Sequence, residues 1–422
     1  MSNAPVPDGQ RIAIVGAGIS GLVAAYLLQQ RHEITVYEAG AYIGGHTNTI
    51  EVDTPQGPLP VDTGFIVYNE RNYPLFSRLI EQLGVESQPS TMSFSVSDER
   101  SGLEYNGSSL NQLFASRKNI ASPKHWRMIR DIMRFNRDAE QLHERGTAST
   151  VEEYVRENGF SDAFLTMYLI PIGASIWSCP SGTFRSFPIR FVIDFLRNHG
   201  MLQVGDRPQW RVIRSGSKQY IKPLTASFHE SISINTPVQA IERTEDAVSV
   251  RLGSGEQHAF DHVVLACHSD QALRLLERPT PTEQQILSAF PYQLNETVLH
   301  TDASILPRRR RAWGSWNYRI REDNADRVAI TYYMNMLQSL ESREHYCVTL
   351  NETDRIDPAK IIRTIPYHHP IFTQERDAAQ ARHYELIGPN RTSFCGAYWG
   401  YGFHEDGAQS GARVAAHFGC TL

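Results

Sequence analysis

The sequence predicts an α/β fold that begins with a parallel βαβ unit, and three features of residues 11–46 support this prediction. An apolar run at residues 12–15 is typical of a buried parallel strand. A G-x-G-x-x-G turn follows it and opens a helix predicted over residues 20–30. A second predicted strand, residues 33–37, ends in an acidic residue. This order and spacing are typical of a unit that binds a dinucleotide.

Each glycine of the turn has its own role. Gly16 allows the tight turn, Gly18 lets the backbone approach a diphosphate, and Gly21 lets the helix pack closely on the strand. The helix directs its N-terminal amides at the phosphates, and Glu38 follows Gly16 at the distance where a ribose hydroxyl needs an acceptor. A glycine-rich turn without a ligand is the alternative. The predicted contacts are Gly16, Ala17, Gly18, Ser20, Gly21, Glu38 and Ala39.

A second glycine pair decides which dinucleotide is expected. Gly44, Gly45 and His46 lie in the stretch IGGHTNT, which resembles the GG-R-x-x-T extension of the FAD-binding flavin amine oxidase superfamily. In that superfamily the second pair brings backbone amides to the phosphates of FAD, so the resemblance implies FAD as cofactor. His46 stands where the family has arginine. Two interpretations stay open: a contact with phosphate or flavin whose charge depends on pH, or a loop histidine without a ligand.

Composition limits the class of protein. The chain has 422 residues, enough for two intertwined domains, and its net charge of −5 argues against nucleic acid as a partner. Five cysteines without a C-x-x-C pair indicate neither a disulfide framework nor a metal site, and they suit a reducing compartment. The N-terminus lacks the apolar core of a signal peptide, and no apolar run reaches the roughly 18 residues that span a bilayer. We therefore expect a soluble cytoplasmic protein, at most peripheral at the inner face of the membrane.

The chain is predicted to form two interleaved domains. One is a discontinuous, glutathione-reductase-type Rossmann-like FAD-binding domain made of residues 1–85, 212–285 and 392–422. The other is an α+β substrate domain, a mixed sheet plus helices, made of residues 86–211 and 286–391. Val238 lies on an alternating strand pattern, and residues 261–267 read as a buried strand. The last segment is predicted as a strand at 393–400, a loop, and a helix at 407–418.

A closer resemblance covers nearly the whole chain. VDTGFIVYNERNYPLF (61–76), MSFSVS (92–97), AWGSWNYR (312–319) and FCGAYWGYGFHEDGAQSG (394–411) resemble a bacterial subgroup of predicted FAD-binding proteins within the superfamily. They also resemble the oxidase-like N-terminal domain of plant cyclopropane fatty-acid synthases. The resemblance implies further FAD contacts from the segment under the flavin ring, a valine at the adenine, the flavin-side loop and the start of the last helix: Thr63, Gly64, Phe65, Val238, Gly396, Gly407 and Ala408.

The catalytic candidates follow from the same resemblance. Tyr398, His404 and Glu405 are expected near the substrate face of the flavin ring. For His404 and Glu405, a hydrogen-bonded loop framework is the alternative. Amine oxidases of the superfamily place a lysine near flavin N5 in a K-V-x-L pattern, whereas the corresponding segment here reads ETVLH, with Glu296 or Thr297 at the lysine position. This departure argues against amine oxidation.

The leading hypothesis is hydride transfer from an apolar substrate to FAD. The resemblance to a lipid-modifying fusion protein and the aromatic-rich substrate segments favour desaturation, or allylic oxidation or isomerisation, of an unsaturated or methyl-branched fatty-acyl chain. Oxygen or a diffusible acceptor then removes the electrons. Two alternatives stay open: an amine or amino-acid oxidase that releases peroxide, and a non-catalytic FAD-stabilised partner of a lipid methyltransferase.

Residues 124–137, KHWRMIRDIMRFNR, are predicted to form a basic amphipathic helix. Such a helix can lie on an anionic bilayer. The alternative is that its apolar side packs on the substrate domain, as in most surface helices. Arg308 to Arg311 form a second basic cluster.

Overall fold

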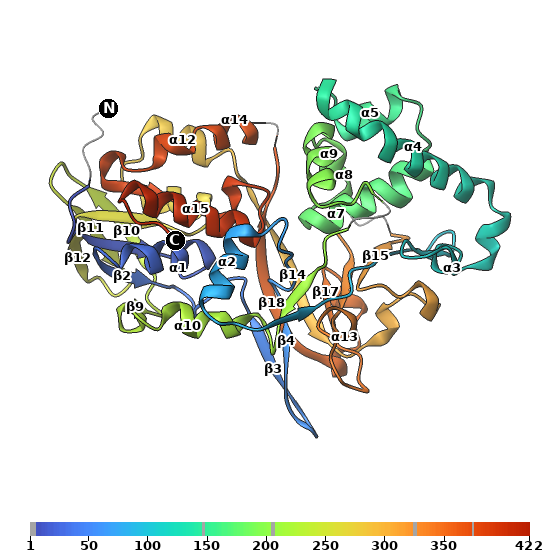
Figure 1. Cartoon of the computed structure of the whole chain (residues 1–422), viewed down its shortest axis with the longest axis horizontal. Coiled ribbons are helices and arrows are strands. Elements are labelled where there is room, and N and C mark those ends of the chain that lie inside the picture. Colours follow the sequence, from blue (N-terminus) through green and yellow to red (C-terminus); the bar gives the residue numbers. More distant parts are fainter. Residues whose placement is uncertain (1–5, 146–147, 204–206, 324–326, 374) are drawn as a thin grey trace.

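The structure is a computed structural model that describes residues 6–145, 148–203, 207–323, 327–373 and 375–422. It has two lobes, and long strands run between them (Figure 1). The C-terminus lies on the lobe that carries β1 and α15. No helix in the described ranges combines the length and the apolar character that a bilayer crossing requires.

A five-stranded parallel sheet organises the first lobe. Its order is β19-β13-β1-β2-β9, so the first strand of the chain lies at the centre. Ile12 and Ile14 on this strand are completely buried, which explains its uninterrupted apolar sequence. All five strands come from the three segments assigned to the FAD domain. Their bounds are β1 Arg11–Val15, β2 Glu33–Tyr37, β9 Ile232–Ser233, β13 His262–Leu265 and β19 Thr392–Phe394.

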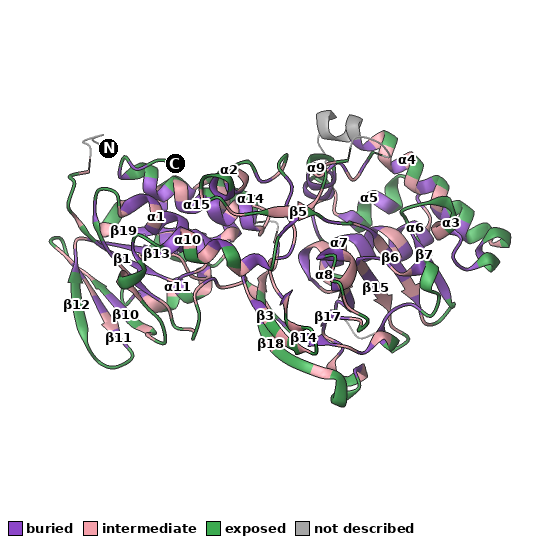
Figure 2. Cartoon of the chain, turned by 60° about the horizontal axis from the view of Figure 1, so that its bottom comes forward, coloured by how far each residue is buried: buried purple, intermediate pink, exposed green. Residues whose placement is uncertain are grey.

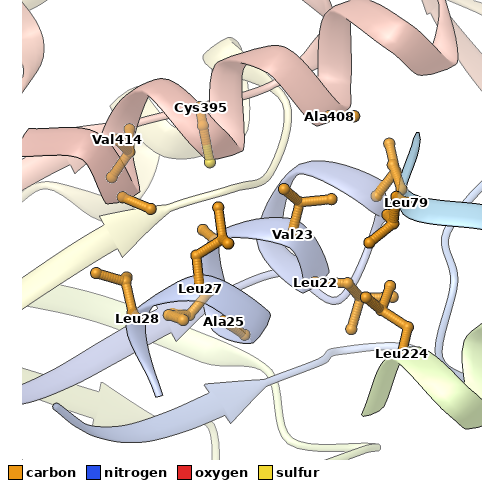
Figure 3. Close-up of a cluster of buried hydrophobic side chains, with 14 of the residues drawn as sticks. Leu22, Val23, Ala25, Leu27, Leu28, Leu79, Leu224, Cys395, Ala408 and Val414 are labelled. Atoms are coloured by element: carbon orange, nitrogen blue, oxygen red, sulfur yellow. The ribbon is translucent and has the colours of Figure 1, made fainter. Parts of the chain in front are cut away.

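Helices α1 (Ile19–Leu28) and α15 (His404–His417) pack closely together beside this sheet. Gly411 makes the approach feasible, because a Cβ there would lie 2.2 Å from the backbone oxygen of Ser20. Leu22, Val23 and Leu27 of α1 fill the core between α15 and two further helices (Figure 3). These are α2 (Pro74–Gln82) and α10 (Ile221–Thr225). The lobe also carries α11 (Ser269–Leu275), α12 (Pro281–Leu287), α14 (Arg376–Ala381) and an antiparallel sheet of β10 (Val238–Arg243), β11 (Val248–Leu252) and β12 (Gln257–Phe260).

A seven-stranded mixed sheet organises the second lobe, in the order β18-β14-β17-β16-β15-β6-β7. The strands are β6 Phe94–Asp98, β7 Leu103–Asn106, β14 Tyr292–His300, β15 Trp316–Ile320, β16 Ile330–Tyr333, β17 Cys347–Leu350 and β18 Ile361–Pro370. The helices of this lobe are α3 Leu110–Leu113, α4 Pro123–Arg145, α5 Val151–Glu157, α6 Asp162–Phe164, α7 Ile170–Trp177, α8 Ser181–Arg185, α9 Ile189–Asn198 and α13 Met334–Leu337.

Two short antiparallel pairs complete the fold. The hairpin of β3 (Thr49–Thr54) and β4 (Gly57–Asp62) leads into the segment predicted to run under the flavin. The pair β5 (Ser87–Pro89) and β8 (Arg211–Ile213) joins the two ends of the long insertion at residues 86–211. The two ends of this insertion are therefore held side by side.

The C-terminal segment differs from the prediction in two ways. The strand predicted at 393–400 is wrong beyond residue 394, where β19 ends. The predicted loop around residue 404 is also wrong, because α15 begins at His404 rather than at Gly407. The reason is a cap: the Asp406 carboxylate accepts a hydrogen bond from the Phe403 amide at 2.8 Å and closes the first turn. Gly407 and Ala408 consequently lie inside the helix.

Candidate active site

A cavity of about 1350 Å³ reaches from the glycine turn after β1 to the helices α3 and α4 of the second lobe. Its first part is lined by backbone and polar groups of the first lobe. Its second part is lined by apolar side chains of the second lobe, on β6, β15, β16, α7 and α9. The cavity thus joins the predicted cofactor segments to the predicted substrate segments.

The two glycine motifs meet at one end of the cavity. The amide of Gly44 donates to the carbonyl of Ala17 at 2.9 Å, and Gly44 forms a parallel bridge with Gly18. Gly16 has φ +107°, and a Cβ on it would lie 2.8 Å from the carbonyl oxygen of Ala266. A Cβ on Gly18 would meet no protein atom within 4 Å. The space in front of the backbone amides of this turn is therefore open, and a diphosphate needs such a space.

Glu38 lies at the carboxyl end of β2, on the wall of the cavity. Its carboxylate accepts hydrogen bonds from the amides of Ala17 at 2.8 Å and Gly40 at 2.7 Å. These bonds fix the carboxylate beside the glycine turn. An acidic side chain held there suits the ribose hydroxyls of a dinucleotide.

The His46 side chain is buried on the cavity wall, and one of its ring nitrogens makes no hydrogen bond. Its ring stacks on Tyr367, with ring centres 4.8 Å apart, and its buried Nε2 has no hydrogen-bond partner. Burial lowers the pKa of His46 to about 4, so the imidazole is neutral near pH 7. A buried polar atom without a partner is costly. Because His46 lines the cavity beside the glycine turn, a polar group of a bound cofactor would be a suitable hydrogen-bond partner for its Nε2.

The segment after β4 is held tightly. Asp62 is completely buried, and its Oδ1 accepts hydrogen bonds from the Thr49 hydroxyl at 2.6 Å and the Ser217 amide at 2.8 Å. A Cβ on Gly64 would lie 2.3 Å from the carbonyl oxygen of His46. Thr63, Gly64 and Phe65 therefore run directly along the His46 segment, where they line the cavity.

The three catalytic candidates lie in different surroundings. His404 lines the cavity, stacks on Phe65 with ring centres 3.7 Å apart, and shares a 2.8 Å hydrogen bond through Nε2 with the Tyr220 hydroxyl. Burial lowers the pKa of His404 to about 3, so it is neutral. Tyr398 also lines the cavity, and its buried hydroxyl has no hydrogen-bond partner.

Glu405 does not line the cavity. Its carboxylate accepts hydrogen bonds from the amides of Leu75 at 3.0 Å and Phe76 at 2.9 Å, at the N-terminus of α2. Tyr73, the residue that precedes α2, gives no side-chain cap. Glu405 therefore supplies that cap from α15, which is a framework role.

The predicted cofactor residues fall into two groups. Most line the cavity: Gly16, Gly18, Ser20, Glu38, Ala39, Gly44, Gly45, His46, Thr63, Gly64, Phe65, Val238 and Gly396. Ala17, Gly21, Gly407 and Ala408 do not. Gly21 and Gly407 instead allow close packing. A Cβ on Gly21 would lie 2.0 Å from the backbone oxygen of Gly16, and a Cβ on Gly407 would lie 2.7 Å from Ile19 Cγ2.

Sequence reasoning missed several residues of the cavity wall. His268, His368 and His369 line it near His46, and His268 stacks on Tyr292 with ring centres 4.2 Å apart. Tyr220 links His404 to the hydroxyl of Thr47, 2.6 Å away. These residues come from segments distant in sequence. Only the adjacent pair His368–His369 offers a signal in the sequence, and that signal is unspecific.

The open glycine turn, the fixed Glu38 carboxylate and the unpartnered Nε2 of His46 together fit a dinucleotide cofactor. A family model described as flavin containing amine oxidoreductase matches residues 19–302, more than half of the chain. The chain therefore belongs to this family of FAD-dependent oxidoreductases, and its cofactor is FAD.

Individual relatives are more distant. Protoporphyrinogen oxidase 2 of Arabidopsis thaliana is 34% identical over 101 residues, which is 24% of this chain and only 18% of that relative. A CLA-producing fatty acid isomerase from P. acnes has the same fold, with a TM-score of 0.69 and 14% identity over 99% of both chains. Cyclohexylamine oxidase from Brevibacterium oxydans has a TM-score of 0.66, at 16% identity over 98% of this chain and 99% of that one.

Proposed function

We propose that this oxidoreductase removes hydride from an unsaturated or methyl-branched fatty-acyl chain, with desaturation, allylic oxidation or double-bond isomerisation as the outcome. The observation that supports this most directly is the second part of the cavity. Its walls are apolar and aromatic, and among the described residues that line the whole cavity the sole carboxylate is Glu38, at the cofactor end.

The shape and chemistry of the walls suit a long apolar chain. Side chains from four elements face the same space: Phe94 of β6, Ile172 and Trp177 of α7, Trp316 of β15 and Tyr332 of β16. Burying such a chain among apolar side chains is favourable at about 25 cal/mol per Å². An apolar lining with few polar groups is also what a pocket for an apolar ligand requires.

The same walls are unsuited to an amine. None of the five lysines of the chain lines the described cavity. Thr297, one of the two residues expected at the position of the amine-oxidase lysine, lines the cavity, and its hydroxyl donates to the Asn295 carbonyl at 3.3 Å. A buried ammonium without a carboxylate partner would be strongly unfavourable. The fold itself does not decide, since fold neighbours include both an acyl-chain enzyme and amine oxidases.

The chain's own residues would hold and orient the substrate. FAD, when bound, supplies the acceptor for the hydride. The apolar walls exclude water and align the acyl chain, since hydride transfer needs a close and fixed approach. An allylic carbon loses hydride most easily, because the positive charge that develops is delocalised. In desaturation a second C–H proton goes to a protein base, and in allylic oxidation water adds to the cation and loses a proton to that base. In both cases the electron pair leaves to oxygen or a small diffusible acceptor. In isomerisation the hydride returns to the other end of the allyl cation.

His404 and Tyr398 are the two proposed catalytic residues. His404 is neutral, and a 2.8 Å hydrogen bond between its Nε2 and the Tyr220 hydroxyl fixes its ring on the cavity wall. Burial raises the pKa of Tyr398 well above its ordinary value, so its hydroxyl keeps its proton. Glu405 has no part in this scheme, because the amides of α2 occupy it.

Product analysis tests the proposal. The purified FAD-loaded protein is incubated in air with oleate, linoleate, saturated stearate, cyclohexylamine or putrescine, and lipid mass, double-bond position and peroxide are measured. We expect a product that has lost two hydrogens or moved a double bond from the unsaturated chains alone. Peroxide with an amine and unchanged lipids would reject the proposal. Inertness towards all five, with capture of a lipid methyltransferase, would instead support the non-catalytic alternative.

A further inference from the structure

We infer that the face formed by α3, the segment 114–122 and α4 docks on an anionic lipid bilayer and opens the cavity to it. This inference rests on the proposed function, because it names where an acyl substrate enters. We call this surface the entry face and define it as the exposed residues of 107–137.

The rim of the cavity lies on the entry face. Leu110 of α3 and Met133 of α4 both line the cavity, and they are 77% and 69% exposed. Gly107 and Ser108 line it too and are exposed. Arg207, from the loop after α9, is the one charged side chain among the described residues that line this part of the cavity, and it is also exposed. The apolar interior thus reaches solvent beside large apolar side chains and a cation.

Exposed apolar side chains are concentrated here. Nine large hydrophobic side chains are exposed in the described part of the chain, and four of them lie within residues 110–133. Besides Leu110 and Met133 these are Ile120 and Trp126, which are neighbours, because the Trp126 indole N–H donates to the Ile120 carbonyl at 2.8 Å. Apolar side chains gathered on one surface indicate a partner rather than water.

Helix α4 separates an exposed side from a cavity side. Trp126, Arg130, Met133 and Arg137 follow one another at spacings of four, three and four residues, so they share one side of the helix. All four are exposed (Figure 2 shows α4 at the edge of the molecule). Ile129 and Ile132 lie on the neighbouring side and line the cavity. Part of α4 thus contacts the cavity, and another part is exposed and available to a bilayer, with Met133 at the boundary.

The charge of the entry face is opposite to that of the chain. Residues 107–137 contain seven lysines and arginines and one aspartate, whereas the whole chain has a net charge of −5. This aspartate, Asp131, is paired with Arg127, and Asp138, just beyond the entry face, is paired with Arg137. The turn η6 (Arg310–Ala312) contacts α3 and adds the exposed Arg310 and Arg311. Basic residues around exposed Trp and Met side chains match an anionic lipid surface.

Vesicle flotation tests the inference. The FAD-loaded protein, without substrate, is mixed with vesicles of phosphatidylcholine alone or with added phosphatidylglycerol. We expect flotation with the anionic vesicles, weakened by high salt. The pair Arg130→Glu and Arg137→Glu should reduce the partition coefficient roughly tenfold or more. The matched control, Arg363→Glu with Lys222→Glu, changes the net charge equally on other surfaces and should float like the wild type.

A second pair of variants tests the apolar part. Leu110→Ser with Met133→Ser should weaken flotation, and Leu294→Ser with Ile362→Ser, exposed on β14 and β18 at the opposite edge of the sheet, should not. Flavin content and far-UV circular dichroism show that each variant is folded. Failure of the wild type to float with anionic vesicles, or equal flotation of entry-face and control variants, would overturn the inference. Turnover of detergent-dispersed oleate by the wild type is measured separately, so the proposed function is judged independently.

Discussion

Gly18 leaves open space at the start of α1, where the cofactor is proposed to bind. Its φ of −76° is accessible to any residue, and a Cβ there would touch no protein atom within 4 Å. Backbone geometry therefore does not require glycine at this position. We propose that the open space above it does, because a diphosphate of FAD bound there would have to reach the amides at the start of α1.

Replacing Gly18 separates cofactor binding from folding. We expect Gly18→Val to fold with a melting temperature close to that of FAD-free wild type, because the new side chain enters open space. It should lose most of its bound FAD, because the same side chain fills the diphosphate position. Flavin absorbance per protein and thermal unfolding measure both effects. Gly107→Val, another site where a Cβ meets nothing within 4 Å, serves as control and should retain FAD. Full FAD content in Gly18→Val would contradict the cradle.

At this scale, spacing along the chain was enough to name five residues that the fold brings to one cavity, and their contact with FAD stays a prediction. Gly16, Gly18, Glu38, Gly44 and Gly45 all line the cavity, since a short βαβ unit fixes where they lie. Residues contributed by distant segments were not predictable in the same way. Whether Phe94 or Trp316 faces the cavity or the core depends on which strands pair, and no local pattern in the sequence records that pairing.

Helices α2 and α15 stabilise each other through a side chain that was predicted to be catalytic. The Glu405 carboxylate satisfies two amides at the N-terminus of α2, and it is 5% exposed. The sequence assigned residues 404–406 to a loop, and the capping role of Asp406 that starts α15 there was not recognised. An element boundary moved by one turn changed the interpretation of Glu405 from a substrate-side group to a cap.

Removing the cap should affect stability rather than chemistry. We expect Glu405→Ala to lower the free energy of unfolding by roughly 2–3 kcal/mol, because two buried amides lose their acceptor and the start of α2 loses a negative charge. The rate of flavin reduction in the folded fraction should change little. Gln409→Ala, which removes only a neighbour of Glu405, is the control. An unchanged melting temperature with abolished flavin reduction would restore Glu405 as a catalytic residue.

The whole molecule buries many histidines, which makes its stability depend on pH. His262, His300 and His383 lie outside the cavity lining and are 5%, 0% and 2% exposed. Burial lowers the pKa of His262 to about 3 and the pKa values of His300 and His383 to about 4. In the unfolded chain these groups have a pKa near 6.5. The unfolded state therefore takes up protons first as pH falls below 6.5, and stability is lost.

Acidification from pH 7.5 to 5.5 should destabilise the protein. Each of the three histidines contributes a loss of about 1.3 kcal/mol over this range. Burial raises the pKa of Asp62 and Asp406 to about 6, so these carboxyls take up protons in the folded state and offset about 2 kcal/mol in total. We expect a net fall in melting temperature by differential scanning fluorimetry. His300→Gln should be less stable at pH 7.5 but lose less on acidification. Equal melting temperatures at the two pH values would contradict this account.

The arrangement of the two lobes joins the cofactor cradle to an apolar cavity that opens on a basic surface. We propose that an unsaturated acyl chain reaches the flavin through this cavity and reduces it. Anaerobic mixing of the FAD-loaded protein with oleate or an unsaturated phospholipid, followed by flavin absorbance, tests this most directly. The account predicts loss of the oxidised flavin spectrum with unsaturated chains and none with stearate. No loss with any lipid, together with rapid loss on adding an amine, would contradict it.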